Sequence, residues 1–149
     1  ENDYRGLDAE LGWIHPVAHM SDLLWRFALH PETSSEQAEP ILAAVQSKVA
    51  PTTVFYGSNE SDRLARVVTT VVLRKLISAE KIATWLQTFE APTSMQKWSD
   101  AFASPEGMAE LHNTKLFLRA LSDQLDGEDV DPVIAVPLAE LVQGFTQLI

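Results

Sequence analysis

The 149-residue sequence contains no cysteine, an absence that excludes disulfide bonds and thiolate metal sites and fits the reducing cytoplasm. It also has no run of about 20 apolar residues, the length that a membrane-spanning helix requires. No basic segment precedes an apolar one near its start, where a secretion signal would have both. These absences together predict a cytoplasmic protein that does not cross a membrane.

Basic residues are scarce, because 11 Lys and Arg stand against 21 Asp and Glu for a formal net charge of −10 at pH 7. Nonspecific binding of nucleic acid needs clustered Lys and Arg that neutralise phosphates, so we expect no nucleic-acid partner for this acidic chain. Only Arg63, Arg66, Arg74 and Lys75 come close together in the sequence. Their spacing predicts that they line the outer face of one helix.

Linkers rich in Gly or Ser are also missing, while 46% of the residues are hydrophobic. A chain of this length is large enough for one core and too short for two, so residues 1–149 are predicted to form a single domain. Apolar residues recur at helical spacing throughout, whereas no run alternates strictly between apolar and polar residues. The sequence therefore predicts an all-α fold.

The predicted helices are six: from about Gly12 to His30, after Ser34 or Ser35, after Ser58-Asn59, after the cap Ser78, from Pro105, and from Asp131-Pro132. Long helices begin near Gly12, Glu60 and Pro105, roughly 45 residues apart, which is the period of two-helix HEAT-type repeats. We therefore expect stacked antiparallel helix pairs that resemble an α-α superhelix. An irregular helical bundle is the alternative.

One face of the first predicted helix carries nearly all of its polar side chains. His15, His19, Asp22 and Arg26 stand at i, i+4, i+7 and i+11, so they share one face of a helix that starts near Gly12. Two imidazoles one turn apart and a carboxylate one turn further on make His15, His19 and Asp22 candidate ligands of a divalent metal.

Two other interpretations of this polar stripe remain open. The stripe is expected either to form a network that ties the helix to Arg5, Asp62 or Asn113, or to face solvent. Zinc peptidases carry a glutamate after their first histidine, and Pro16 occupies that place here. Trp13 stands beside the stripe, where it is expected either to form the wall of a pocket or to pack in the core.

Four segments carry a family resemblance: Asp3-Tyr4-Arg5-Gly6, the signature Gly12-Trp13-x-His15-x-x-x-His19-x-x-Asp22, Asp62-Arg63-Leu64-Ala65, and Asn113-x-x-x-Phe117-Leu118-x-x-Leu121. They resemble a bacterial family known only as domain of unknown function family 2785, and the likeness spans nearly the whole chain. The resemblance implies an all-α cytosolic protein and supplies no reaction. Because members of that family are usually longer, the chain is expected to be the C-terminal part of a longer helical protein.

These observations favour a helical scaffold over an enzyme. The scaffold would bind a protein partner or a small ligand in a groove lined by the first long helix, and it needs no cofactor. The residues expected around this groove are Arg5, Trp13, His15, His19, Asp22, Arg26, Asp62 and Asn113. If the first helix exposes an apolar face, a homodimer is a further expectation.

The alternative function is a metal-dependent hydrolase. Its divalent metal would be held by His15, His19 and Asp22, with Glu10 or Asp62 as a further ligand or base.

Overall fold

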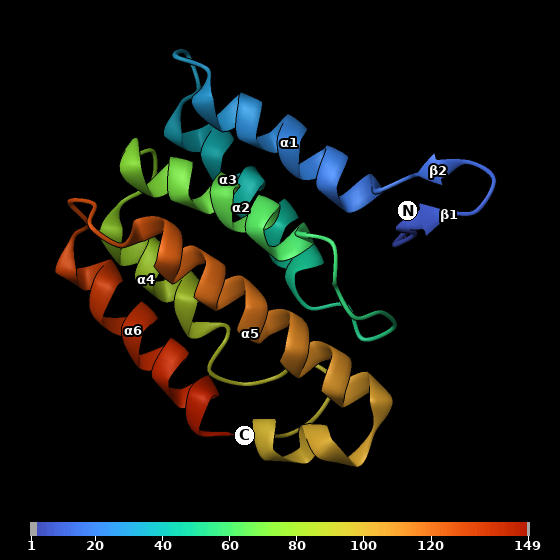
Figure 1. Ribbon diagram of the computed structural model, residues 1–149. Helices are drawn as coiled ribbons and strands as arrows, with labels where there is room; N and C mark the ends of the chain where they lie inside the picture. The colour runs from blue at the N-terminus through green and yellow to red at the C-terminus, as the bar shows by residue number, and fades with distance from the viewer. Residues whose placement is uncertain (1–2, 149) are drawn as a thin grey trace.

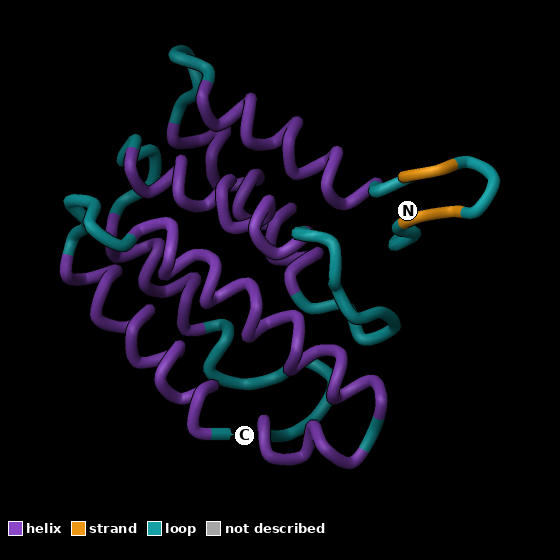
Figure 2. Tube along the Cα trace, in the orientation of Figure 1, coloured by secondary structure: helices purple, strands orange, loops and turns teal. Residues whose placement is uncertain are grey.

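The computed structural model describes residues 3–148, which form six α-helices, one short 3-10 helix and one hairpin of two short strands (Figures 1 and 2). In chain order these are β1 (Leu7–Asp8), β2 (Gly12–Trp13), α1 (Pro16–Leu29), α2 (Ser35–Val49), α3 (Glu60–Leu73), α4 (Ala79–Gln87), η1 (Trp98–Ala103), α5 (Pro105–Leu125) and α6 (Pro132–Gln147). The all-α prediction is confirmed. In this part of the chain, no helix is both long and apolar enough to span a bilayer.

The helix α3 lies between α1 and α5 and makes its most extensive contacts with these two (Figure 1). The helix α2 packs against α1 and α3, while α6 packs against α4 and α5. The short helix η1 covers the beginning of α5, where Gly107 allows the two backbones to approach closely. A Cβ atom at Gly107 would stand 2.7 Å from the Ala101 carbonyl oxygen. The HEAT-like superhelix and the single domain stay predictions.

Local capping chemistry explains where three of the helices begin. Ser78 accepts a hydrogen bond from the Lys81 amide at 3.4 Å, and Ser104 accepts one from the Gly107 amide at 3.0 Å. The Asp131 carboxylate accepts a hydrogen bond from the Val133 amide at 2.9 Å. Each cap satisfies an amide that has no partner inside its helix. The predicted starts of α4, α5 and α6 are confirmed.

The predicted start of the first helix is wrong. The helix α1 begins at Pro16 rather than Gly12, and the preceding residues form the β1–β2 hairpin, in which Leu7 pairs with Trp13. A proline disfavours helical backbone in the residue before it but fits the first helical position, where its missing N–H has no role. His15 accordingly adopts the left-handed conformation, with φ 39°.

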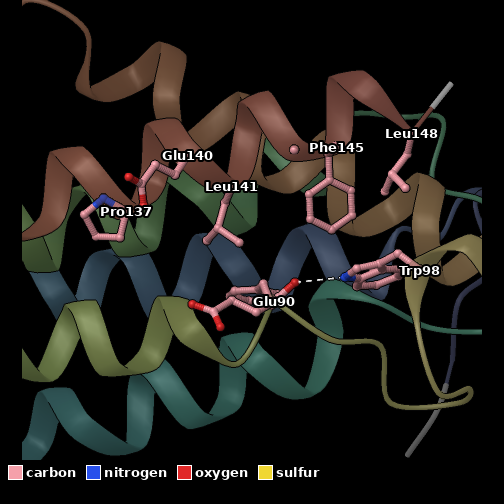
Figure 3. A pocket seen from close by; sticks show the side chains of 9 residues that line it. Glu90, Trp98, Pro137, Glu140, Leu141, Phe145 and Leu148 are labelled. Atoms are coloured by element: carbon pink, nitrogen blue, oxygen red, sulfur yellow. Dashed lines mark hydrogen bonds between the residues drawn. The ribbon is translucent and has the colours of Figure 1, made fainter.

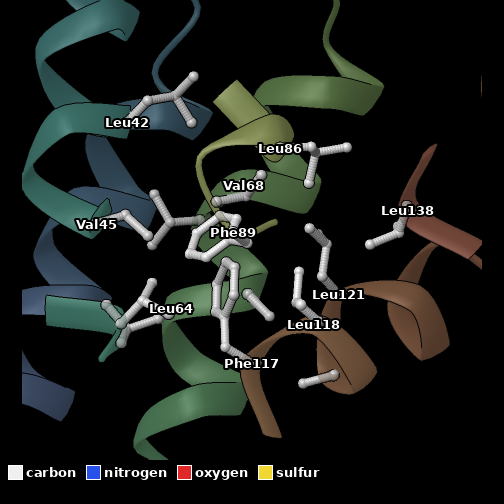
Figure 4. Close-up of a cluster of buried hydrophobic side chains, with 14 of the residues drawn as sticks. Leu42, Val45, Leu64, Val68, Leu86, Phe89, Phe117, Leu118, Leu121 and Leu138 are labelled. Atoms are coloured by element: carbon white, nitrogen blue, oxygen red, sulfur yellow. The ribbon is translucent and has the colours of Figure 1, made fainter. Parts of the chain in front are cut away.

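The hydrophobic core gathers side chains from α1 to α6, and Figure 4 shows part of it. Its labelled members are Leu42, Val45, Leu64, Val68, Leu86, Phe89, Phe117, Leu118, Leu121 and Leu138. Phe117 is fully buried, and its ring centroid lies 5.7 Å from that of Phe89 and 6.0 Å from that of Trp85. Burying one such side chain contributes about 1.5–3 kcal/mol to stability, so this centre holds α3, α4 and α5 together.

Candidate functional site

Arg63 and Arg74 of the α3 segment are half-buried beside α1, whereas Arg66 is exposed but still contacts α1. Arg63 pairs with Asp22 of α1, and the Arg66 guanidinium lies over the Trp25 ring, 5.1 Å from its centroid. The prediction that Arg63, Arg66, Arg74 and Lys75 line an outer face is wrong for Arg63 and Arg74, because α1 packs along their side of α3, whereas Arg66 and Lys75 are exposed. An arginine combines charge with a flat surface that stacks on aromatic rings. Arg63 and Arg66 therefore connect α3 to α1 at two points.

Arg74 joins the other end of the two helices. Its guanidinium donates hydrogen bonds to the carbonyl oxygens of Ala28 and His30, the latter at 2.9 Å. The last carbonyls of a helix have no partner within it and carry partial negative charge. Arg74 therefore caps the C-terminal end of α1 from the end of α3.

His15 does not share a helix face with the rest of the predicted stripe, because it precedes the first helical residue. Its side chain is 13% exposed, and its Nε2 atom lies 3.8 Å from Oε1 of Glu60, whose side chain is 11% exposed. Within residues 3–148 this buried Nε2 has no hydrogen-bond partner. The Trp13 indole meets the imidazole edge on, 4.5 Å between ring centroids, while Trp13 itself is 60% exposed and outside the core.

The two other candidate metal ligands face different surroundings from His15. His19 is exposed, and Asp22 is half-buried in its pair with Arg63. Across residues 3–148, no three His, Asp or Glu side chains are grouped so that they could hold a metal ion. The metal-dependent hydrolase stays a prediction, and the described residues do not bring its proposed ligands together.

The predicted network partners take other positions. Arg5 forms an ion pair with Asp3 at 2.6 Å, and this side-chain hydrogen bond lowers the pKa of Asp3 to about 2. Asp62 is exposed, and its backbone carbonyl accepts a hydrogen bond from Gln124 at 3.0 Å. The polar contacts between α1 and the α3 segment run through Arg63 and Arg74.

Asn113 is buried and holds the segment between α2 and α3 through hydrogen bonds. Its amide nitrogen donates to the carbonyl oxygens of Pro51 and Val54 at 3.0 and 2.8 Å, and its oxygen accepts from the Tyr56 amide at 2.8 Å. All three partners are backbone groups that would otherwise be buried without a hydrogen bond. Asn113 therefore shapes this segment and lies away from a groove on α1.

The outward side of α1 is apolar along its centre and basic along one edge. Met20, Leu23 and Phe27 stand at i, i+3 and i+7 and are all exposed, Phe27 to 54%. The exposed titratable side chains of α1 are His19 and Arg26, both basic residue types. We call these five residues the α1 face. Their spacing in the sequence shows that these three apolar residues share one side of the helix, but it does not show that this side is exposed.

A groove continues the α1 face toward α2. It has a volume of about 540 Å³ and is lined by Phe27, His30, Glu32, Thr33, Gln37, Pro40 and Ile41. Phe27 belongs to both the face and the groove, so an apolar side chain that packs on the face would have an adjacent recess. The hairpin adds Leu7, Leu11 and Trp13, all exposed, at the other end of α1. An exposed apolar helix side of this kind is typical of interaction sites.

The comparisons with known proteins give one match. A family model described as "Protein of unknown function (DUF2785)" matches residues 1–122 of the 149. No curated protein and no solved structure matches the chain. The matched segment includes α1 to η1 and most of α5, whereas α6 lies beyond it.

Proposed function

The chain belongs to the DUF2785 family, and from its structure we propose that it is a helical scaffold that binds a protein partner through the α1 face. The observation that carries the proposal is the exposed apolar row of Met20, Leu23 and Phe27 on the outermost helix of the row α1, α3, α5. A stack of helices needs a polar outer surface on its terminal element if nothing covers it. The outward side of α1 instead exposes the apolar side chains of Met20, Leu23 and Phe27.

The charges of the α1 face favour a particular partner. Its exposed titratable side chains are basic, although the whole chain is strongly acidic. Interactions between exposed charges fade within about 8–10 Å at physiological ionic strength, so the local basic edge decides recognition more than the distant acidic surface does. The partner that fits is an amphipathic helix whose apolar stripe is flanked by carboxylates.

A second copy of this chain fits less well. Two α1 faces brought together would place His19 and Arg26 of both copies at the same contact, and each copy also carries a net charge of −10. Both features oppose self-association. The groove beside Phe27 has room for one apolar side chain of a foreign helix, as helix-in-groove recognition requires.

Site-specific photo-crosslinking tests the proposal. A benzophenone amino acid replaces Phe27 in one variant and Met20 in another, and the exposed Val136 of α6 in a control. We expect both α1 variants to capture the same protein from cells that express the chain natively, through a helical segment rich in Asp and Glu. The control should not capture it, and Arg26→Glu should weaken the capture several-fold.

Two results would overturn the proposal. One is capture of the same proteins from Val136 as from α1, which would mean that the α1 face has no selectivity. The other is crosslinking of α1 to a second copy of the chain, together with a dimer in sedimentation equilibrium, which would make the α1 face a homodimer interface.

A further inference from the structure

A separate apolar pocket lies between α6, η1 and the end of α4, away from the α1 face (Figure 3). Its volume is about 360 Å³, near the lower end of the range of about 300–1,000 Å³ for small-molecule sites. Its lining consists of Phe89, Glu90, Trp98, Pro137, Glu140, Leu141, Gly144, Phe145 and Leu148. The pocket does not share a residue with the α1 face, so an inference about it is independent of the proposed function.

Three buried aromatic side chains make one part of this pocket rigid. Trp98 donates its indole N–H to the Phe89 carbonyl oxygen at 3.1 Å, which fixes the orientation of its ring. The Phe145 ring meets Trp98 edge on, with 4.9 Å between centroids. Phe89, Trp98 and Phe145 are all buried. An apolar ligand would meet a preformed surface here, because none of these rings needs to be ordered on binding.

The charged part of the pocket is entirely acidic. Figure 3 shows the carboxylates of Glu90 and Glu140 at one end of the pocket, and Trp98, Phe145 and Leu148 at the other. Among the described residues that line it, none is basic. The nearby cations have other partners, since Lys97 lies 4.0 Å from Asp100 and Arg119 donates to Thr146 at 3.3 Å.

The backbone adds negative potential to that of the two carboxylates. Gly144 and Phe145 belong to the last turn of α6, and Phe89 and Glu90 follow Thr88, the C-terminal cap of α4. Carbonyl groups at the C-terminal end of a helix carry partial negative charge, and neither helix has a basic residue in its last turn to offset it. Aromatic faces attract cations as well.

We propose that this pocket binds a small organic cation, namely an amine with an apolar or aromatic body. The ammonium group would lie between Glu90 and Glu140, and the body would pack on Trp98 and Phe145. Neutral and anionic molecules of the same shape would gain the apolar contact but lose the attraction of the carboxylates. The proposal concerns binding only and involves no reaction.

Three phenylalkyl compounds of matched size test the charge selectivity. The probes are 4-phenylbutylamine, the alcohol 4-phenylbutanol and the acid 4-phenylbutyrate, each titrated into the whole chain labelled with ¹⁵N. The indole N–H signal of Trp98, assigned with Trp98→Phe, reports binding. We expect the amine to bind at least fivefold more tightly than the alcohol, and the acid to bind most weakly. Equal affinities for the amine and the alcohol would overturn the proposal.

Two kinds of variant locate the site. Glu140→Gln and Glu90→Gln should each weaken amine binding about two- to fivefold and leave alcohol binding unchanged, whereas Asp123→Asn, an exposed acid on α5, should change neither. Gly144→Leu should abolish binding of all three probes with the fold intact, because a Cβ at Gly144 meets nothing within 4 Å. Amine binding that survives Gly144→Leu, or that responds equally to Asp123→Asn, would show attraction to the acidic surface in general and overturn the proposal.

Discussion

At the scale of single residues, Glu110 is a buried charge that several hydrogen bonds hold in place. It lies on α5 with 1% of its surface exposed, and its carboxylate accepts hydrogen bonds from the backbone and hydroxyl groups of Thr93 and Ser94. Burial raises the pKa of this carboxyl, but the hydrogen bonds from Ser94 and Thr93 outweigh burial and hold the pKa below its ordinary value. Glu110 therefore fastens the loop before η1 to α5.

Replacing Glu110 with glutamine is expected to lower the free energy of unfolding at pH 7 by about 2–3 kcal/mol, because an amide satisfies fewer of the four donors. A carboxyl whose folded pKa is lowered stabilises the fold above its unfolded pKa, and this stabilisation is lost as the pH falls through the folded pKa. The variant should therefore lose less stability than the parent between about pH 5 and pH 3. Urea unfolding across this range measures both effects.

Glu106→Gln is the matched control for this prediction, because Glu106 is an exposed acid in the first turn of the same helix. It should change the free energy of unfolding by less than about 0.5 kcal/mol. If both variants behave alike, the buried hydrogen bonds of Glu110 contribute nothing specific.

Asn113 is expected to be equally sensitive. Asn113→Ala leaves two backbone carbonyls and one amide of the 51–56 segment without partners, and the expected loss is about 2–4 kcal/mol. Asn113→Asp should be no better, because a carboxylate would face the carbonyl oxygens of Pro51 and Val54. Thermal and urea unfolding give the magnitude. A stable Asn113→Asp variant would contradict the hydrogen-bond assignment.

At the scale of elements, α1 depends on side chains that α3 supplies. Arg74 caps the carbonyl end of α1, Arg63 pairs with Asp22, and Arg66 stacks on Trp25. Its packing against α3 is extensive, while its outer side is exposed. We expect α1 to be the first helix to open, since local stability falls where one side of an element is uncovered.

Arg74→Met tests this dependence, because methionine keeps much of the aliphatic bulk and removes the hydrogen bonds to Ala28 and His30. We expect a loss of about 1–2 kcal/mol in global stability, and hydrogen-exchange protection that falls most in α1. Lys75→Met serves as the control, since Lys75 is the exposed basic neighbour. Uniform loss of protection across α3, α4 and α5 would show that Arg74 supports the core rather than α1.

Helix type and most helix starts could be predicted from the sequence, because the signals are local. Ser78, Ser104 and Asp131 stand immediately before apolar periodic segments, and their side chains cap the helices that follow. The start of α1 was missed because apolar periodicity continues through Gly12–His15, whereas Pro16 and the hairpin decide the backbone there. Because α1 begins four residues later than predicted, His15 lies outside the helix and outside the predicted polar stripe.

The direction in which a helix face points could not be predicted in the same way. The spacing of Arg63, Arg66 and Arg74 shows that they share a face, but only the packing of α1 against α3 shows that α1 partly covers Arg63 and Arg74 and leaves Arg66 exposed. Met20, Leu23 and Phe27 also share one side of a helix by their spacing. Apolar residues usually face a core, yet the tertiary structure leaves these three exposed. Periodicity gives relative positions on one helix, and tertiary contacts assign each side its neighbour.

At the scale of the whole molecule, the dominant electrostatic property is a net charge of −10 on 149 residues. Charges of one sign repel one another more in the compact state than in the unfolded chain, so the excess destabilises folding. Added salt screens this repulsion at distances beyond about 10 Å, while short contacts such as Arg63 with Asp22 are screened less.

Raising NaCl from about 0.02 M to about 0.5 M is therefore expected to raise Tm by roughly 2–4 °C, the equivalent of about 1 kcal/mol. Differential scanning calorimetry at fixed pH measures the shift, and an equal osmolality of an uncharged solute provides the baseline. A lower Tm at high salt would mean that attractive ion pairs outweigh the repulsion of the acidic surface.

The central position of α3 also affects how the protein is made. The helix is complete at Leu73, but α5, which covers one of its sides, is complete only at Leu125. At about 5–20 residues per second, the roughly 50 residues in between take about 3–10 s to synthesise. For those seconds the nascent chain carries an apolar helix side without its partner. A chaperone that binds exposed apolar segments would therefore act on this chain mainly while the residues between α3 and the end of α5 are being synthesised.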